Sequence, residues 1–233
     1  MGAPADTRAG RPGKTPQAGG TTAPDDIEGT ERLFWALMLK FEGLALERYS
    51  AHTPRLATDE KRSFVASLHA LETDEASLAA SVLAPPVEEL VARARSTDAV
   101  SALIVQGLVL EHLGQAIYRV ATETERASPA SRALAAAGCA ASRSVTTEAS
   151  AEIAAHVGTA DRLYAVFADT SEHVLAALDA LAEPVDEVFG ERFGLRFADV
   201  MGEFAAGLVT ACTALGMQRR KVIGHLAGAC MGL

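Results

Sequence analysis

Acidic residues on the apolar face of predicted helices are the part of this sequence that could do chemistry. Glu42 lies within an apolar stripe that includes Met38 and Tyr49 at helical spacing. Glu111 lies seven residues before Tyr118, in the middle of a second apolar face. An ionised carboxylate in a low-dielectric interior costs several kcal/mol unless a cation compensates it. These positions therefore predict bound cations.

The same periodicity predicts inward carboxylates on two more helices. Glu72 and Glu75 fall on the apolar stripe of one predicted helix, and both are expected to face inward. Glu148 and Glu152 lie one turn apart on the helix predicted over residues 130–159, with His156 a further turn along. Inward carboxylates on four helices are typical of four-helix bundles that hold a pair of metal ions. For any one of these residues, a solvated or salt-bridged glutamate is the alternative.

Long helices must position these side chains. Proline disrupts helix interiors and marks the boundaries between apolar-periodic segments. Helices are predicted over residues 27–53, 58–83, 98–125, 130–159, 161–182 and 195 to the end, with a short piece at 186–192. The predicted fold is all-α, an antiparallel four-helix bundle with additional C-terminal helices. Residues 1–27 are predicted to be a disordered tail, and residues 28–233 the helical domain.

Composition excludes several classes of protein. An aromatic content of 5% argues against an all-β fold, and a net charge of -9 argues against nucleic acid as a partner. Three cysteines without a short spacing fit a reducing compartment. The apolar run Phe204–Met217, at 14 residues, is shorter than the ~20 of a membrane span and predicts a core helix. With no secretory signal in the sequence, a soluble cytoplasmic protein without a membrane span is expected.

Three segments of the sequence carry a family resemblance. Leu103-Ile-Val-Gln-Gly-Leu-Val-Leu-Glu111 is an apolar run that ends in a glutamate, with Tyr118 seven residues later. Glu42-Gly43 is followed by Tyr49 at the same spacing, and Leu215-Gly-Met-Gln-Arg-Arg-Lys-Val-Ile lies in the last predicted helix. With these motifs the chain after the tail resembles the cyanobacterial aldehyde-deformylating oxygenases, or aldehyde decarbonylases, of the ferritin-like di-iron superfamily.

The resemblance implies metal ligands at four of that family's six positions, namely Glu42, Glu72, Glu111 and Glu148. The family places Glu-x-x-His on its second and fourth helices. Here Glu75 stands where the histidine after Glu72 is expected, and Ala151 stands three residues after Glu148. A shifted register offers Glu152 with His156 instead. A carboxylate-rich site favours manganese or iron, whereas the loss of both histidines could leave a site that binds metal weakly or not at all.

The activity implied by the resemblance is that of a non-haem di-metal oxygenase or oxidase. Family members hold a fatty aldehyde in an apolar channel and convert it to a hydrocarbon one carbon shorter plus formate. They use O2 and an external electron donor such as ferredoxin. Two iron ions are the expected cofactor, with manganese or a mixed Mn/Fe pair as alternatives. The competing hypothesis is a ferritin-like bundle with a degenerate metal site, acting as a binding or structural protein.

Overall fold

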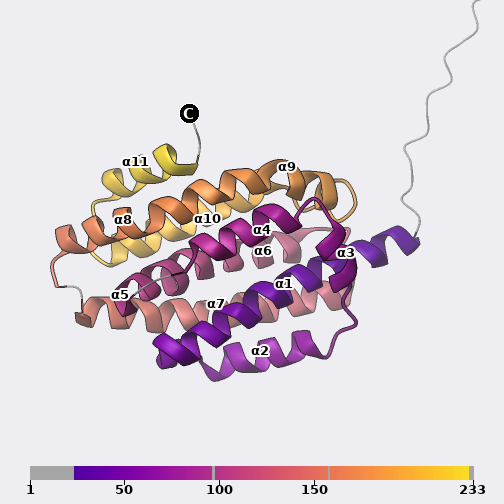
Figure 1. The fold of residues 1–233 in the computed structure, drawn as a ribbon, viewed down its shortest axis with the longest axis horizontal. Helices are drawn as coiled ribbons and strands as arrows, with labels where there is room; N and C mark the ends of the chain where they lie inside the picture. The colour runs from indigo at the N-terminus through magenta and orange to yellow at the C-terminus, as the bar shows by residue number, and fades with distance from the viewer. Residues whose placement is uncertain (1–23, 96–97, 157, 231–233) are drawn as a thin grey trace, which may run out of the picture.

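A computed structural model describes residues 24–95, 98–156 and 158–230, and within these ranges the secondary structure is entirely helical (Figure 1). The α-helices are α1 (Pro24–His52), α2 (Asp59–His69), α3 (Glu75–Ala80), α4 (Ala84–Arg93), α5 (Ala99–Ala102), α6 (Glu111–Glu123), α7 (Pro129–His156), α8 (Ala160–Leu178), α9 (Ala182–Val185), α10 (Phe197–Ala214) and α11 (Arg219–Cys230). Pro54–Leu56 and Asp179–Leu181 form 3-10 turns, and Leu103–Leu110 and Asp186–Gly190 are π-helical. Most of the predicted tail, residues 1–23, lies outside the described residues, and residues 24–27 begin α1.

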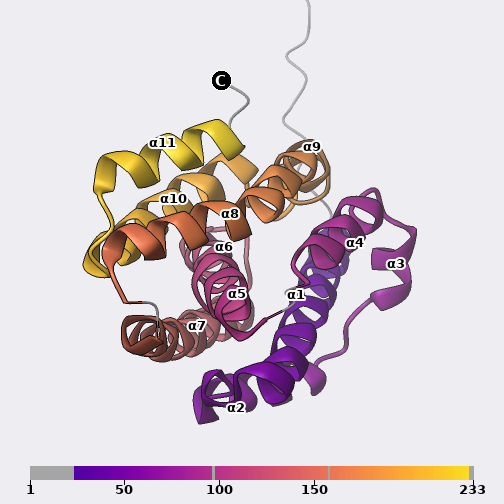
Figure 2. The same ribbon diagram turned by 60° about the vertical axis from the view of Figure 1, so that its left-hand side comes forward.

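The π-helical segment Leu103–Leu110 and α6 together form the central rod of the bundle. This rod contacts α7 along one side and α8 and α10 along another. Helices α1 and α2 pack on each other and α2 packs on α7, while α8, α10 and α11 form a layer on the opposite side (Figure 2). A residue at the junction between the π segment and α6 therefore lies near the middle of the molecule, and Glu111 is that residue.

The π segment that precedes Glu111 is buried from Leu103 through Val109. Such segments are rare, and they are frequently found at functional sites. Gly107 lets this wide turn approach α7, because a Cβ built there would lie 2.7 Å from the Cβ of Ala149. The close approach fixes the position of Glu111 relative to α7.

Glu31 fixes the start of α7 against α1. Its carboxylate accepts hydrogen bonds from the backbone N–H and the hydroxyl of Ser128, at 2.5 and 2.9 Å. It also accepts one from the hydroxyl of Ser131 at 2.9 Å, and that hydroxyl in turn accepts one from the indole N–H of Trp35 at 3.0 Å. These bonds satisfy groups at the helix start that would otherwise lack partners, and they set the spacing of the two helices.

Two of the predicted helices are broken. The helix predicted over 58–83 is wrong beyond His69, because α2 ends there and the side chain of Asp74 starts α3 by accepting a hydrogen bond from the backbone of Ser77 at 2.9 Å. The helix predicted from 195 onward divides at Gly216, whose φ of +87° ends α10 with N–H bonds back to the last turn.

Two helical stretches, Ala99–Glu123 and Phe197–Ala214, are long and apolar enough to cross a membrane by length and composition. In an 18-residue apolar window of Ala99–Glu123, 67% of the residues are buried, as in a central core helix of a bundle, whereas in Phe197–Ala214 28% are buried. The latter packs Phe204, Leu208 and Cys212 inward. The predicted core helix at Phe204–Met217 therefore has one buried face, and its outer face carries mostly small residues.

The contact between α7 and α6 gives a test of packing. A Cβ at Gly138 would lie 2.8 Å from Cδ2 of Tyr118 and 2.9 Å from Cζ of Phe64. We expect G138A to lower the free energy of unfolding by about 1–2 kcal/mol, because overpacking outweighs the gain in helix propensity of about 1 kcal/mol. The control, G202A in α10, has open space and should be neutral or stabilising. Urea unfolding followed by circular dichroism measures both, and equal losses would contradict the importance of this close contact.

Candidate functional site

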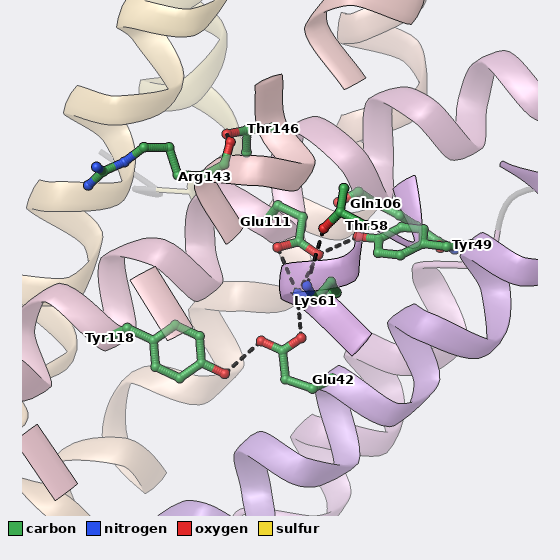
Figure 3. A network of polar contacts seen from close by, with 9 residues as sticks. All are labelled: Glu42, Tyr49, Thr58, Lys61, Gln106, Glu111, Tyr118, Arg143 and Thr146. Carbon is green, nitrogen blue, oxygen red and sulfur yellow. Dashed lines mark hydrogen bonds and ion pairs between the residues drawn. The ribbon is translucent and has the colours of Figure 1, made fainter. Parts of the chain in front are cut away.

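A buried lysine lies between two buried glutamates at the centre of the bundle (Figure 3). The side chains of Lys61, Glu42 and Glu111 are 1%, 6% and 3% exposed. The ammonium of Lys61 lies 2.7 Å from Oε1 and 2.9 Å from Oε2 of Glu111, and it forms an ion pair with Oε2 of Glu42. These three residues, from α2, α1 and α6, are called the Lys61 triad.

Local structure at the start of α2 aims Lys61 at the other two helices. The side chain of Thr58 caps α2 by accepting a hydrogen bond from the backbone N–H of Lys61 at 3.2 Å. This cap satisfies an otherwise unpaired donor and sets the first turn of the helix. Phe64 and Leu68, further along the same face, are buried, so Lys61 occupies the first position of an inward stripe.

Two tyrosines complete the polar network. The phenol of Tyr49 donates to Oε1 of Glu111 at 2.5 Å, and the phenol of Tyr118 donates to Oε1 of Glu42 at 2.6 Å. Tyr49 shares α1 with Glu42, and Tyr118 shares α6 with Glu111, so the two bonds cross between the helices (Figure 3). Together with the Lys61 triad they tie α1, α2 and α6 together.

The electrostatics of the site favour a charged lysine and neutral phenols. Burial raises the pKa of Glu42 above 4.5, and Lys61 opposes that effect. Burial would lower the pKa of Lys61, but the carboxylates of Glu111 and Glu42 outweigh it and leave that pKa raised above 10.5. Burial and the carboxylates raise the pKa of Tyr49 and of Tyr118 well above 10.0. Both phenols therefore act as hydrogen-bond donors at neutral pH.

An apolar cavity of about 90 Å³ adjoins the Lys61 triad. The triad and the two tyrosines form its polar wall, and Arg48 lies on its lining as well. Its apolar walls come from α1, α4 and the central rod, and include Met38, Leu44, Leu90, Leu113 and Ile117. The cavity can enclose an apolar group with a polar atom turned toward the triad.

Of the predicted metal ligands, the structure brings Glu42 and Glu111 together at the centre of the bundle. The inward orientation predicted for Glu72 and Glu75 is wrong, because α2 ends before them and neither side chain lies in the core. Glu72 forms a surface ion pair with Arg32 at 3.1 Å and is 80% exposed. These two carboxylates therefore lie on the surface, apart from the Lys61 triad.

The acids predicted on α7 also lie away from the Lys61 triad. Glu148 is exposed. Glu152 forms an ion pair with Arg55, and its Oε2 lies 3.6 Å from Nδ1 of His156, so the predicted proximity of Glu152 and His156 is present. These two residues line a second cavity, of about 260 Å³, which shares no lining residue with the first.

Sequence reasoning missed Lys61, the residue at the centre of the site. A signal was available, because Lys61 lies three residues before Phe64 and seven before Leu68 on the apolar stripe of its helix. Periodicity therefore identified the two inward acids, and the same test applied to cations would have identified their partner.

The residues present do not fit a two-metal centre of the kind that the resemblance implies. The family's Glu-x-x-His pairs would need buried carboxylates and imidazoles on two helices. The buried residues of α2 and of α7 include no Asp, Glu or His. Within residues 24–95, 98–156 and 158–230, no three His, Cys, Asp or Glu side chains gather in a way that could hold a metal ion. Metal binding by Glu42 and Glu111 stays a prediction.

The described residues have an all-α, ferritin-like fold, an antiparallel four-helix bundle with additional C-terminal helices, and the predicted fold class is confirmed. A solved structure described as "Protein 19 with aldehyde deformylating oxidase activity from Synechococcus" is similar to this chain, with a TM-score of 0.66 and 16% sequence identity. The match covers 89% of this chain and 98% of that chain. No family model and no curated protein matches the sequence.

Removing the buried ammonium tests its role in stability. We expect K61M to lower the free energy of unfolding by about 3–5 kcal/mol, because two buried carboxylates lose their cation. The matched control is K40M, which removes a lysine of α1 that forms a more exposed ion pair with Glu88 and should cost less than about 1 kcal/mol. Urea unfolding at pH 7 measures both, and similar small losses would contradict the assignment.

The raised pKa values of the buried tyrosines predict that the free energy of unfolding falls at alkaline pH. The pKa of Tyr118 is raised well above 10.0 in the folded protein. At a pH above about 10, the folded protein therefore keeps a phenol proton that the unfolded chain releases. The contribution of Tyr118 to the free energy of unfolding is fully present below the pKa that tyrosine has in the unfolded chain. It falls by about 1.4 kcal/mol per pH unit as the pH rises from there toward the higher pKa of the folded protein. We expect Y118F to flatten the fall in unfolding free energy above pH ~10 by that amount. Urea unfolding of both proteins between pH 7 and 11 measures the slopes, and parallel curves would argue against a buried, bonded phenol.

Proposed function

We propose that the protein binds an apolar small molecule, with an aldehyde-like compound as the first candidate, in the cavity beside the Lys61 triad. The supporting observation is the cavity itself, whose apolar walls end at a buried wall of one ammonium, two carboxylates and two phenols. Ligand sites in proteins commonly combine apolar walls with a few fixed polar groups that orient the ligand. A carbonyl oxygen directed at this wall would have to share donors, because the ammonium of Lys61 and the phenols of Tyr49 and Tyr118 already contact the glutamates.

The size of the cavity limits what it can enclose. A dry apolar cavity of about 150 Å³ accepts benzene, so the 90 Å³ found here holds a shorter piece of a chain. Leu44, Ala45 and Arg48 are partly exposed lining residues, and they mark the side on which a longer chain would leave the cavity. The proposed ligand therefore has its polar end inside and its remaining chain along α1.

The cellular setting forms part of the proposal. We place the protein in the cytoplasm, without a membrane span and without nucleic acid as a partner. Cys139 and Cys212 are free thiols, as expected in a reducing compartment. Burial raises the pKa of the Cys212 thiol to about 12, which leaves it unreactive.

A second candidate function is the non-haem di-metal oxygenase or oxidase. The observations that favour it are the fold shared with a protein of aldehyde deformylating oxidase activity and the apolar cavity beside Glu42 and Glu111. It would require two iron ions, or manganese or a mixed Mn/Fe pair, with O2 and an external electron donor such as ferredoxin. Because Lys61 already contacts both carboxylates, the binding proposal has the stronger geometric support.

Binding can be tested with a series of straight-chain aldehydes of about four to twelve carbons, measured by calorimetry. Each buried methylene contributes about 0.8 kcal/mol, so we expect affinity to rise about fourfold per carbon until the chain leaves the cavity. A45F should fill the cavity and weaken binding at least about tenfold, which is about 1.4 kcal/mol. The control A206F, on the outer side of α10, should bind as the wild type does.

The same samples separate the two candidate functions. Under the binding proposal, aldehyde incubated with iron-supplied protein, O2 and an electron donor is recovered unchanged. Catalytic release of formate with a hydrocarbon one carbon shorter would establish the oxygenase instead. Binding that ignores both chain length and A45F would contradict the use of this cavity.

A further inference from the structure

We infer that the ammonium of Lys61 is the permanent cation of this site and that it occupies the place where a metal-binding bundle of this fold would hold its metal ion. This inference concerns the charge balance of the centre, and it does not rest on the proposed ligand. The observation behind it is the disagreement between the residues present and a two-metal centre. The contacts, the space and the charge at the centre each support it.

Every carboxylate oxygen of the Lys61 triad is in contact with one of the protein's own donors. The Lys61 ammonium bridges carboxylates from two facing helices, with Glu42 on α1 and Glu111 on α6. Both oxygens of Glu111 contact Lys61, and one of them also accepts from Tyr49. Glu42 uses Oε2 for Lys61 and Oε1 for Tyr118. The contact of Glu42 Oε2 with Lys61 is an ion pair without a hydrogen bond. An added cation that bound these oxygens would have to displace the ammonium of Lys61 from them.

The lysine side chain itself fills the space at the centre. Lys61 is 1% exposed, so its stem and ammonium occupy the interior between α1, α2 and α6. A divalent ion that bound Glu42 and Glu111 would need the same oxygens and would repel the ammonium at close range. Lysine and metal are therefore mutually exclusive occupants of this centre.

At the centre the ammonium offsets one carboxylate charge, and the two neutral phenols stabilise the remaining charge by hydrogen bonds. Two buried carboxylates without a cation are strongly unfavourable, and one ammonium leaves a single excess negative charge among two phenol donors. Arginine is the more usual cation in buried ion pairs, but the ammonium of lysine is a compact point charge, and in that respect it resembles a metal ion. The chain holds 21 Lys and Arg residues, most of them arginine, yet a lysine occupies this position.

The inference predicts that exchanging the lysine for an acid turns the centre into a metal site. In K61E three carboxylates converge in a dry interior, and a divalent cation would be needed to hold them together. We expect K61E to melt at a lower temperature than the wild type without metal, and to gain about 5–10 °C when Mn²⁺ is about 100-fold above its dissociation constant. The wild type and the control K40E, which changes the more exposed lysine of α1, should show no shift with Mn²⁺.

Metal content gives an independent measurement. The full chain is expressed with iron and manganese supplied, and both metals are then measured by plasma mass spectrometry. The inference expects far less than one metal ion per wild-type chain. One to two ions per wild-type chain, or a Mn²⁺-dependent rise in its melting temperature, would overturn the inference. Failure of aldehyde binding would leave these results unaffected.

A charge-free variant covers the case in which K61E does not fold. E42Q/K61M/E111Q replaces all three charged groups by neutral ones of similar size, so no cation is needed. We expect this triple variant to melt well above K61M alone and to ignore Mn²⁺. If the triple variant were as unstable as K61M, the lysine would act through packing rather than as a cation, and the inference would be overturned.

Discussion

Two carboxylates in the interior of a helical bundle require a positive charge between them, and the ammonium of Lys61 supplies it. The requirement constrains three helices at once, because Glu42, Lys61 and Glu111 come from α1, α2 and α6. The phenols of Tyr49 and Tyr118 add bonds that cross between α1 and α6. The arrangement of the bundle around its centre is therefore held by a polar network as well as by apolar packing.

The same network forms one wall of the apolar cavity, and this links the stability of the fold to its proposed function. A ligand that enters the cavity meets charged groups that are already in contact with one another, so it needs no charge of its own. Chemistry at a bound metal would compete for the carboxylate oxygens that Lys61 contacts. A shared fold does not fix the chemistry of a site, and the similarity to an aldehyde deformylating oxidase at 16% identity is a similarity of helix arrangement.

How far the sequence could predict the site varied from one helix to the next. Glu42 and Glu111 were identified as inward because each belongs to a helical segment that continues on both sides, so periodicity gave the direction of the side chain. Glu72 and Glu75 were assigned wrongly because the cap formed by Asp74 interrupts the predicted helix, and a local hydrogen bond of this kind overrides an average periodicity.

By itself the sequence determined the all-α bundle, the approximate ends of α1, of Ala99–Glu123 and of α7, and the presence of buried acids, because these follow from local periodicity, proline positions and the cost of burying charge. Only the tertiary structure decided which cation balances those acids. Lys61 is far from Glu111 along the chain, and the direction of a side chain on its helix does not give its distance from residues on another. The identity of the partner therefore depends on how three helices meet.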